Sequence, residues 1–324
     1  MKRKNGIDLF RFIGAFFIML VHTKYGYLPE EYVDNIRISA RWAVPFFFLC
    51  SGYFLQSKIT DNKILDFRKI EKNIVNLISI IIVASFVYLL VNRSFTLEVS
   101  SILTGTYFHL WFIGSLIFGY LFLWYIYYIK RTRLLPLISS LILLSALFSD
   151  SYDVTMGINL DYYTFGFFIS IPFLYFGLVI SRFKFSKTQT QIIFIIFILS
   201  FALQYIESNQ LFKHYFYPKY DHQLLIGTII SSVSLFILTT KINIQNNRLS
   251  DWGKDYSLFI YLYHPFIYYL INTGFGKTLP NAFGYLSIFN PILGFTISLL
   301  GAIFIEKYFN SLFNLLNGRF LQKQ

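Results

Sequence analysis

The sequence predicts an all-α, polytopic membrane helix bundle with about ten transmembrane helices, and three observations support this fold class. Hydrophobic residues make up 56% of the 324 positions. Charged residues make up only 14%, against roughly 25% in soluble domains. Apolar runs recur along the whole chain with short basic clusters between them, which is the pattern of a protein that crosses a bilayer many times.

Ten apolar segments are expected to cross the membrane. The fifth, seventh and ninth are shorter than the ~20 residues of a full span, so any of them can tilt, thin the bilayer or re-enter it. The expected spans are residues 7–23, 40–56, 74–91, 107–129, 134–148, 163–180, 190–206, 223–240, 256–272 and 291–313.

The distribution of Lys and Arg predicts the orientation of these spans. Segments on the side of the N-terminus carry 19 Lys and Arg residues, whereas segments on the opposite side carry 7. Because cytosolic loops are enriched in basic residues, both termini are expected in the cytosol. No internal repeat or soluble appendage interrupts the pattern, so residues 1–324 are expected to form a single integral membrane domain.

Composition also limits the partners and cofactors. Cys50 is the only cysteine, which excludes an intramolecular disulfide and a Cys-based metal site, and no metal is expected. The net charge of +12 is spread among the loops, so it does not indicate a nucleic-acid partner; the lipid bilayer is the expected one. The basic start, Met1–Lys4, precedes an apolar run without a small-residue cleavage site, so the run is expected to be retained as the first span.

The first span carries three polar side chains, Asp8, Arg11 and His22, in an otherwise apolar segment. His22 follows Arg11 by about three helical turns, so both leave the same helix face roughly 16 Å apart along the axis. An arginine facing lipid costs about 2.5–3.5 kcal/mol, so this face is expected to meet protein or a watery cavity. The alternative, in which Arg11 reaches the cytosolic surface and His22 caps an interface, stays open at this point.

The second span contains an unusual run of proline, serine and glycine among aromatic residues. Pro45 is expected to kink the helix. Gly52, next to Ser51, allows a ligand or another backbone to come close. Tight helix packing explains the same glycine without a ligand.

The inner loop at residues 66–72 places Arg68, Lys69 and Lys72 within about one helical turn of one another. Such a cluster can bind phosphates. The excess of positive charge on cytosolic loops and attraction to anionic lipid headgroups explain the same residues without a soluble ligand.

The fourth span opens with His109 and Trp111, preceded by Tyr107. These residues fit an aromatic belt at the outer membrane surface. They also fit a substrate cavity, and the segment alone does not distinguish the two.

The ninth span carries a second polar stripe. Tyr261, His264 and Tyr268 share a helical face. Pro265 cannot donate a backbone hydrogen bond, so it leaves a carbonyl near Tyr261 in need of another partner. Because an ionisable residue inside a membrane is a functional candidate, this face is expected to line the cavity.

Taken in order, five segments of the chain resemble the acyltransferase 3 family of integral membrane proteins. Members have about ten spans, and many O-acetylate surface polysaccharides. The resemblance runs from residue 7 to about 310, and it is the combination of segments that is specific. The segments are Asp8–His22, Phe46–Tyr53, His109–Phe112, Phe173–Gly177 and Tyr261–Pro265.

The resemblance implies roles for the matching residues. His22 matches the family's essential histidine, the acyl-transfer base or a transient acyl carrier. Arg11, with Asp8 one turn before it, matches the essential arginine that engages acyl-CoA. His264 matches a frequent late His-Pro pair. The family's basic cluster after the second span is usually Arg-rich; here residues 68–72 are mostly Lys, which lacks the bidentate fork of Arg.

The resemblance therefore implies a membrane O-acyltransferase of the plasma (inner) membrane. It would move an acyl group, expected to be acetyl, from cytosolic acyl-CoA to a hydroxyl of an extracytoplasmic glycan. Acetyl-CoA is the expected donor substrate, and cell-envelope glycan-assembly proteins are expected partners. The donor is expected near Arg11, Ser51, Gly52 and the basic cluster, and the substrate cavity is expected near His109, Trp111, Tyr261 and His264.

Two other classes of protein use the same polar stripes. One is a transporter or flippase for a polysaccharide precursor or a small polar solute, for which acyl-CoA would be neither hydrolysed nor used in transfer. The other is a noncatalytic membrane subunit of a glycan-assembly complex, in which His22 would be replaceable.

Overall fold

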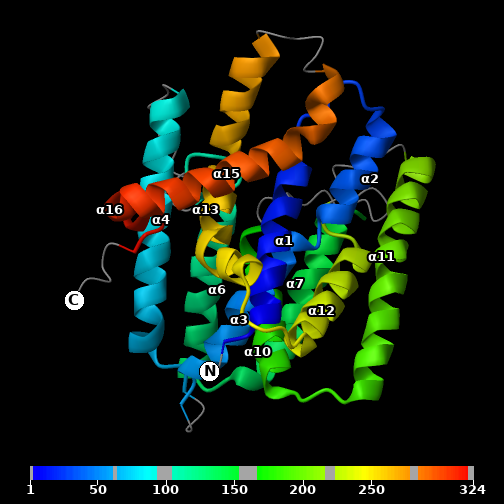
Figure 1. Ribbon diagram of the computed structural model, residues 1–324. Helices are drawn as coiled ribbons and strands as arrows, with labels where there is room; N and C mark the ends of the chain where they lie inside the picture. Colours follow the sequence, from blue (N-terminus) through cyan, green and yellow to red (C-terminus); the bar gives the residue numbers. More distant parts are fainter. Residues whose placement is uncertain are drawn as a thin grey trace.

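The computed structural model describes residues 3–60, 64–92, 104–152, 166–215, 223–277 and 284–319, and within these ranges the chain is a bundle of helices (Figure 1). The only β-type pairing in the described ranges is an isolated bridge between Ile59 and Leu65. The predicted all-α class is therefore confirmed.

The helices are α1 (Asn5–His22), α2 (Glu30–Ala40), α3 (Ala43–Leu55), α4 (Phe67–Asn92), α6 (Trp111–Tyr128), α7 (Leu135–Ser149), α10 (Ser170–Arg182), α11 (Lys187–Tyr215), α12 (Ile226–Lys241), α13 (Arg248–Ile271), α15 (Asn290–Tyr308) and α16 (Asn310–Leu316). Short 3-10 turns occur at η1 (Gln56–Lys58), η2 (Thr132–Leu134) and η5 (Ser287–Phe289), and η4 (Asn272–Gly276) is a π-helical turn.

Each of the ten predicted spans overlaps one of these helices. Seven helical segments of the described chain are long and apolar enough to cross a membrane, and two shorter apolar helices lie at residues 166–182 and 226–241. The helices are thus those of a membrane bundle, while the number of crossings and the cytosolic placement of the termini stay predictions.

The predicted interruption of the second span by Pro45 agrees with the structure: Arg41 and Trp42 keep helical dihedrals but form a break between α2 and α3, and the Arg41 carbonyl is the one that the missing N–H of Pro45 leaves without its helical donor. One detail of the predicted spans is wrong. The tenth span is not continuous to residue 313, because Phe309 leaves helical geometry (φ −136°, ψ 50°) between α15 and α16.

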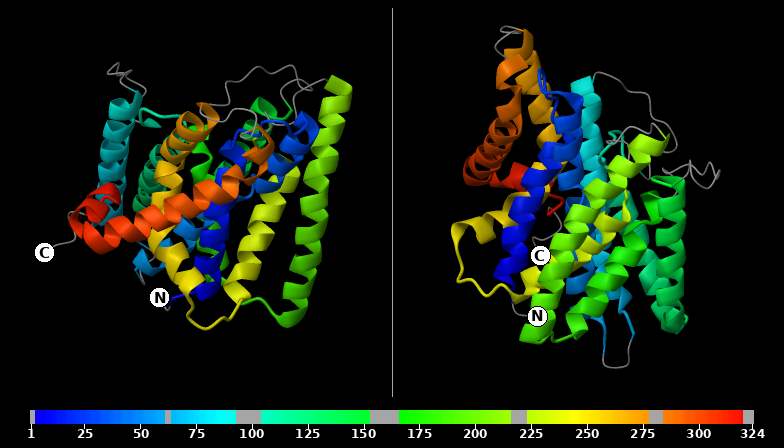
Figure 2. Two further views of the ribbon diagram at one scale, coloured as in Figure 1. Left: turned by 45° about the horizontal axis from the view of Figure 1, so that its top comes forward. Right: turned by 90° about the vertical axis from the view of Figure 1, so that its right-hand side faces the viewer.

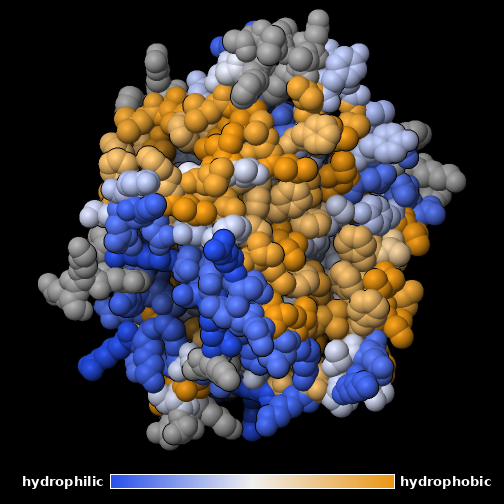
Figure 3. All heavy atoms as spheres, in the orientation of Figure 1, coloured by the Kyte–Doolittle hydropathy of each residue, from blue (hydrophilic) through white to orange (hydrophobic). Residues whose placement is uncertain are grey.

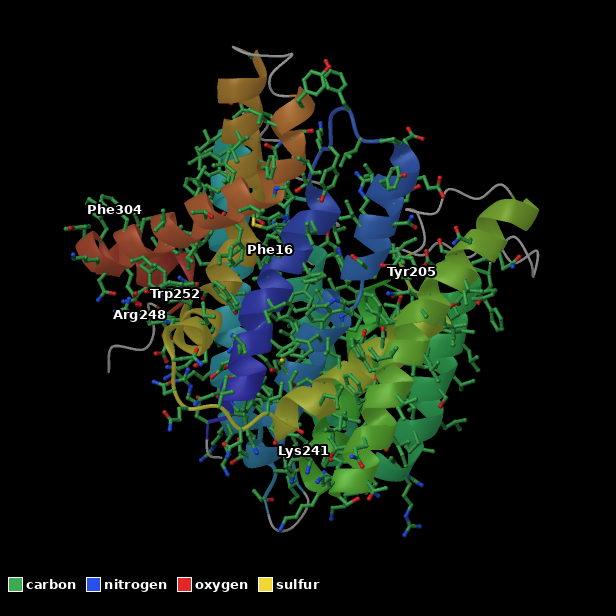
Figure 4. The ribbon with its side chains drawn as sticks, turned by 45° about the vertical axis from the view of Figure 1, so that its right-hand side comes forward. Phe16, Tyr205, Lys241, Arg248, Trp252 and Phe304 are labelled. Atoms are coloured by element: carbon green, nitrogen blue, oxygen red, sulfur yellow. The ribbon has the colours of Figure 1, made fainter. Side chains whose placement is uncertain are left out.

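Helix α1 occupies the middle of the bundle. It packs most extensively on α13 and also contacts α2, α3, α12 and α15. Figures 1 and 2 show α15 crossing α1 and α13 obliquely rather than running parallel to them. Aromatic packing forms the α1–α15 contact, with the rings of Phe12 and Phe16 5.0 and 5.4 Å from that of Phe295. Figure 4 shows Phe16 at this crossing.

Helices α3 and α10 approach each other as closely as their backbones allow. A Cβ atom on Gly52 would lie 2.0 Å from the carbonyl oxygen of Leu174, and one on Gly177 would lie 2.2 Å from that of Leu49. The glycine predicted to accommodate either a ligand or a backbone therefore accommodates the α10 backbone.

The outer surface of the bundle is strongly apolar. Figure 3 shows hydrophobic residues covering the upper and right-hand parts of one face, with hydrophilic residues gathered at the lower left. Phe304 projects from α15 away from the bundle with 55% of its surface exposed (Figure 4). Large exposed apolar faces are unusual on soluble monomers and are typical of surfaces that contact lipid.

Candidate active site

Three histidines from distant parts of the chain meet in the interior of the bundle. His22 is the last residue of α1, His109 lies in the turn before α6, and His264 belongs to α13. The ring of His264 stacks on that of His22, with centroids 5.2 Å apart and planes 25° apart. The ring of His109 also lies 5.2 Å from that of His264, edge to face. The structure thus brings together all three histidines that the sequence proposed for the site.

Pro265 explains the orientation of His264. Because proline has no N–H, the carbonyl oxygen of Tyr261 lacks its helical donor, and Nδ1 of His264 lies 2.7 Å from it. The expectation that a carbonyl near Tyr261 needs another partner is confirmed. The next carbonyl, that of Leu262, accepts a hydrogen bond from the Tyr88 hydroxyl at 2.8 Å.

The backbone of α13 also orients His109, because Nε2 of His109 lies 2.9 Å from the Leu262 carbonyl oxygen. A carbonyl oxygen only accepts, so this Nε2 and the Nδ1 of His264 both carry hydrogens. The other ring nitrogens, Nδ1 of His109 and Nε2 of His264, are buried without a hydrogen-bond partner in the described chain. When the two rings are neutral, Nδ1 of His109 and Nε2 of His264 each carry a lone pair that can accept a proton.

A small cavity, the His22 cavity, adjoins this cluster. It has a volume of about 80 Å³, and its walls include His22, His109, Trp111, Tyr261 and Arg41. The predicted substrate-cavity residues His109, Trp111 and Tyr261 therefore line one space, next to His264. Arg41 also lines this cavity, although it is not among the predicted site residues.

A larger cavity, the Arg11 cavity, lies beyond the histidines. It has a volume of about 400 Å³, and its charged lining consists of Arg11, Lys58 and Arg319, with no Asp or Glu among its described lining residues. Arg11 is also 3.3 Å from Asp8, whose other carboxylate oxygen lies 2.9 Å from Nε of Arg3. The buried Asp8 thus holds Arg11 at the cavity through an ion pair.

Tyr261 lines both cavities. Its hydroxyl donates to the backbone carbonyl of His109, and its ring lies 5.2 Å from that of Phe112. Phe112 in turn stacks on Phe48 at 4.4 Å. These three aromatic side chains separate the two spaces, so Arg11 and His22 reach different cavities from the same face of α1.

The other predicted donor-binding residues have different surroundings. Ser51 lines the Arg11 cavity and donates to the Phe47 carbonyl at 3.0 Å. Arg68, Lys69 and Lys72 are exposed at the start of α4 and are not among the residues that line either cavity. Their role in binding a donor stays a prediction.

Lys58 and Arg319 line the Arg11 cavity although they are not among the predicted site residues. Nζ of Lys58 lies 3.0 Å from Oδ1 of Asn73, which holds the lysine at the cavity wall. A basic residue on an inner loop gives the same sequence signal whether it faces a cavity or lipid headgroups.

Asp150 and Glu207 hold the segment that closes the His22 cavity. Oδ2 of Asp150 accepts from the backbone N–H groups of Gln223 and Leu224, at 2.8 and 2.5 Å, and both of these residues line the cavity. Glu207 accepts from the N–H groups of the first two residues of α12, at 2.8 and 3.0 Å. Burial raises the pKa of Asp150 to about 7. Its hydrogen bonds and the positive charge of Arg41 lower this pKa and only partly oppose the effect of burial.

Among the described residues, no group of three or more His, Cys, Asp and Glu side chains has an arrangement that could hold a metal ion.

Comparisons with known proteins identify the family of the chain. A family model described as "Acyltransferase domain" matches residues 4–306. A curated protein from Enterococcus faecalis named "Amino-acid racemase" is 25% identical over 298 residues, covering 84% of this chain and 42% of its own length. A second protein of that name and organism is 35% identical over 159 residues, covering 46% of this chain and 22% of its own. The chain thus spans less than half the length of these relatives, and no solved structure matches.

Proposed function

Because the chain belongs to the acyltransferase family whose model covers residues 4–306, we propose that it is a membrane O-acyltransferase. It moves an acyl group, acetyl in this proposal, from cytosolic acyl-CoA to a hydroxyl of a cell-surface or extracytoplasmic glycan. The plasma membrane is the proposed location, and cell-envelope glycan-assembly proteins are the proposed partners.

One observation carries this proposal: a cation-lined cavity and a histidine-lined cavity share the wall at Tyr261. An acyl-CoA is a polyanion with a long neutral arm that ends in a thioester. A cavity lined by Arg11, Lys58 and Arg319 and by no described acid suits the anionic part. The thioester end then lies at Tyr261, and its reaction with an acceptor hydroxyl in the His22 cavity requires this aromatic wall to open between the two cavities.

The histidine cluster supplies the base that this reaction needs. As the acceptor oxygen attacks the thioester carbonyl carbon, His22 takes the hydroxyl proton, the new C–O bond forms and the C–S bond breaks. The proton then passes to the departing thiolate, which leaves as the thiol. The ordinary pKa of histidine, about 6.5, allows a neutral ring near pH 7. In a second route His22 is itself acylated and then attacked by the hydroxyl.

Transport is the second candidate, because two cavities in series, separated by an aromatic wall, also suit alternating access to a small polar solute. A transporter would use the same two cavities as the proposed enzyme but would not need acyl-CoA. The racemase name of the curated relatives gives no further candidate, because more than half of each of those chains has no counterpart in this one.

Acyl transfer by the purified protein in liposomes, measured with radiolabelled acetyl-CoA, tests the proposal. Label should move to an acceptor glycan or to water with the wild type and should stop with His22→Ala and Arg11→Ala, each first checked for normal insertion. Label retained on the wild-type protein and lost in His22→Ala selects the acyl-histidine route. If acetyl-CoA neither binds nor turns over, the enzyme proposal fails and solute uptake by the same liposomes is measured next.

A further inference from the structure

The Arg11 cavity contains buried polar atoms that no protein group satisfies. Oδ1 of Asn76, Oδ1 of Asn317 and Oγ of Ser257 are buried without a hydrogen-bond partner in the described chain, and all three residues line this cavity. Ser257 is fully buried, and Asn317 is 2% exposed. Buried polar atoms in folded proteins are nearly always paired, so three unpaired oxygens on one cavity indicate a ligand that supplies the missing partners.

The amide of Asn317 is oriented by its own helix. Its Nδ2 donates to the carbonyl oxygen of Phe313 at 2.9 Å. Because the nitrogen faces that carbonyl, the oxygen is left as the group available to the cavity. Asn317 therefore offers a hydrogen-bond acceptor rather than a donor.

A tight turn brings this residue to the cavity. Gly318 has a φ of +65°, which an L side chain adopts only with strain, and its Cα passes so close to α4 that a Cβ would lie 2.6 Å from the carbonyl oxygen of Asn76. The turn also places Arg319 in the cavity wall, with its guanidinium 5.9 Å from the ring of Phe313. Asn317–Arg319, called the C-terminal turn below, lies beyond residue 306, where the family match ends.

The pattern of donors and acceptors defines the ligand. The two asparagine oxygens only accept, and the Ser257 hydroxyl can accept or donate, so the three atoms suit a molecule with several N–H or O–H groups. The positive charges of Lys58 and Arg319 suit anions. The arm of a pantetheine thioester carries two amide N–H groups and one hydroxyl between its thioester and its phosphate, so it presents both features in one extended molecule. A cavity of about 400 Å³ is within the range of small-molecule sites, about 300–1,000 Å³.

We propose that the C-terminal turn is part of the donor site, where Asn317, Asn76 and Ser257 accept hydrogen bonds from the pantetheine arm and Arg319 and Lys58 bind its phosphates. This inference rests on the proposed acyl-CoA-dependent function and extends it to a specific recognition surface. The site then selects donors by their amide-bearing arm as well as by their charge. Part of the contact with the arm comes from the C-terminal turn, which lies outside the region that the family model matches.

Binding of three probes to the full-length protein in detergent separates the two parts of the site. Acetyl-CoA has the arm and the phosphates, acetyl-pantetheine has only the arm, and adenosine 3′,5′-bisphosphate has only the phosphates. Asn317→Ala and Ser257→Ala should each lower the affinity for acetyl-CoA and for acetyl-pantetheine by about three- to tenfold, which corresponds to the loss of one hydrogen bond. Both variants should leave the affinity for the bisphosphate unchanged. Arg319→Gln should lower the affinity for acetyl-CoA and for the bisphosphate, and it should leave the affinity for acetyl-pantetheine unchanged.

Asn314→Ala is the matched control, because this asparagine lies in α16 just before the C-terminal turn and its side chain contacts Asn310 at an exposed position. It should bind all three probes like the wild type. Ser257 lies in α13 rather than in the C-terminal turn, so its variant tests the arm site even where Asn317→Ala disturbs the turn.

Two results overturn the inference while leaving the proposed function in place. One is that the wild type, Asn317→Ala and Ser257→Ala bind acetyl-CoA with equal affinity. The other is that these two variants lose affinity for all three probes to the same extent. A wild-type protein that binds none of the probes overturns the inference together with the proposed donor.

Discussion

Nδ1 of His264 donates a hydrogen bond to the carbonyl oxygen of Tyr261, three residues earlier on the same helix, at 2.7 Å. This bond replaces the one that the proline at position 265 cannot make. The other ring nitrogen of His264, Nε2, is buried without a partner in the described chain, and the ring stacks on that of His22. A single proline thus sets the tautomer and the direction of the histidine that stacks on His22.

Pro265→Ala should lower the transfer rate without lowering stability. The restored N–H at position 265 competes with His264 for the Tyr261 carbonyl, so the imidazole loses the bond that orients it. We expect acyl transfer to fall about tenfold or more, while the melting temperature stays the same or rises, since alanine favours a helix interior over proline. Transfer assays and thermal unfolding in the same detergent measure both. Unchanged transfer would show that the proline has only a packing role.

His264→Phe should separate ring packing from acid–base chemistry. Phenylalanine preserves an aromatic ring against His22, 5.2 Å away, but removes the unpaired Nε2. If this nitrogen takes part in proton transfer, the rate should fall by about 10²–10⁴-fold, the usual contribution of a general acid–base group. Leu262→Met, at the neighbouring buried position, is the control for substitution in this part of α13 and should keep most of the activity. A His264→Phe variant as active as this control would remove His264 from the chemistry.

Part of this site was predictable from local rules. The helical period placed Arg11 and His22 on one face, and the absence of an N–H in Pro265 predicted a carbonyl near Tyr261 in need of a partner; both depend only on the geometry of a single helix. The packing of His109 against Leu262 depends on how the turn before α6 meets α13, and nothing in either segment specifies that contact.

Other features had two explanations that sequence alone could not separate. Gly52 fits a ligand or a backbone equally well until its neighbour is known, and the neighbour is the carbonyl of Leu174. Arg68 and Lys58 look alike as basic residues of one inner loop, but Lys58 lines the cavity, and Arg68 is exposed. Asn317 gave no signal at all, because a single polar residue after a helix is most often a cap.

The aromatic wall at Tyr261 should keep the donor apart from water in the His22 cavity. Tyr261→Ala would join the two cavities, so we expect acetyl-CoA hydrolysis to increase relative to transfer. Tyr261→Phe keeps the ring and loses only the hydrogen bond to the His109 carbonyl, so transfer should fall modestly without extra hydrolysis. The ratio of free acetate to acetylated acceptor measures this partition. An unchanged ratio in Tyr261→Ala would contradict a separating role.

The close approach of α3 and α10 should make Gly52 intolerant of any side chain. A Cβ at this position would lie 2.0 Å from the Leu174 carbonyl oxygen, so Gly52→Ala must push the helices apart. We expect a loss of about 3 kcal/mol, at the top of the usual range for overpacking. Gly301→Ala is the control, because nothing lies within 4 Å of its added Cβ, and it should be neutral or stabilising by up to about 1 kcal/mol. Equal melting temperatures of the two variants would contradict the packing assigned to Gly52.

Asp150 should make stability depend on pH near neutrality. Its pKa of about 7 in the folded protein exceeds the ordinary value of 3.8, chiefly through burial, so the folded state holds the proton more tightly than the unfolded state. The stability from this group is complete below about pH 4 and is lost as the pH rises through 7. Asp150→Asn keeps a neutral oxygen that accepts from the Gln223 and Leu224 N–H groups. Melting temperatures at pH 5, 6, 7 and 8 should therefore fall more steeply for the wild type than for Asp150→Asn, and a steeper fall for the variant would contradict the assignment.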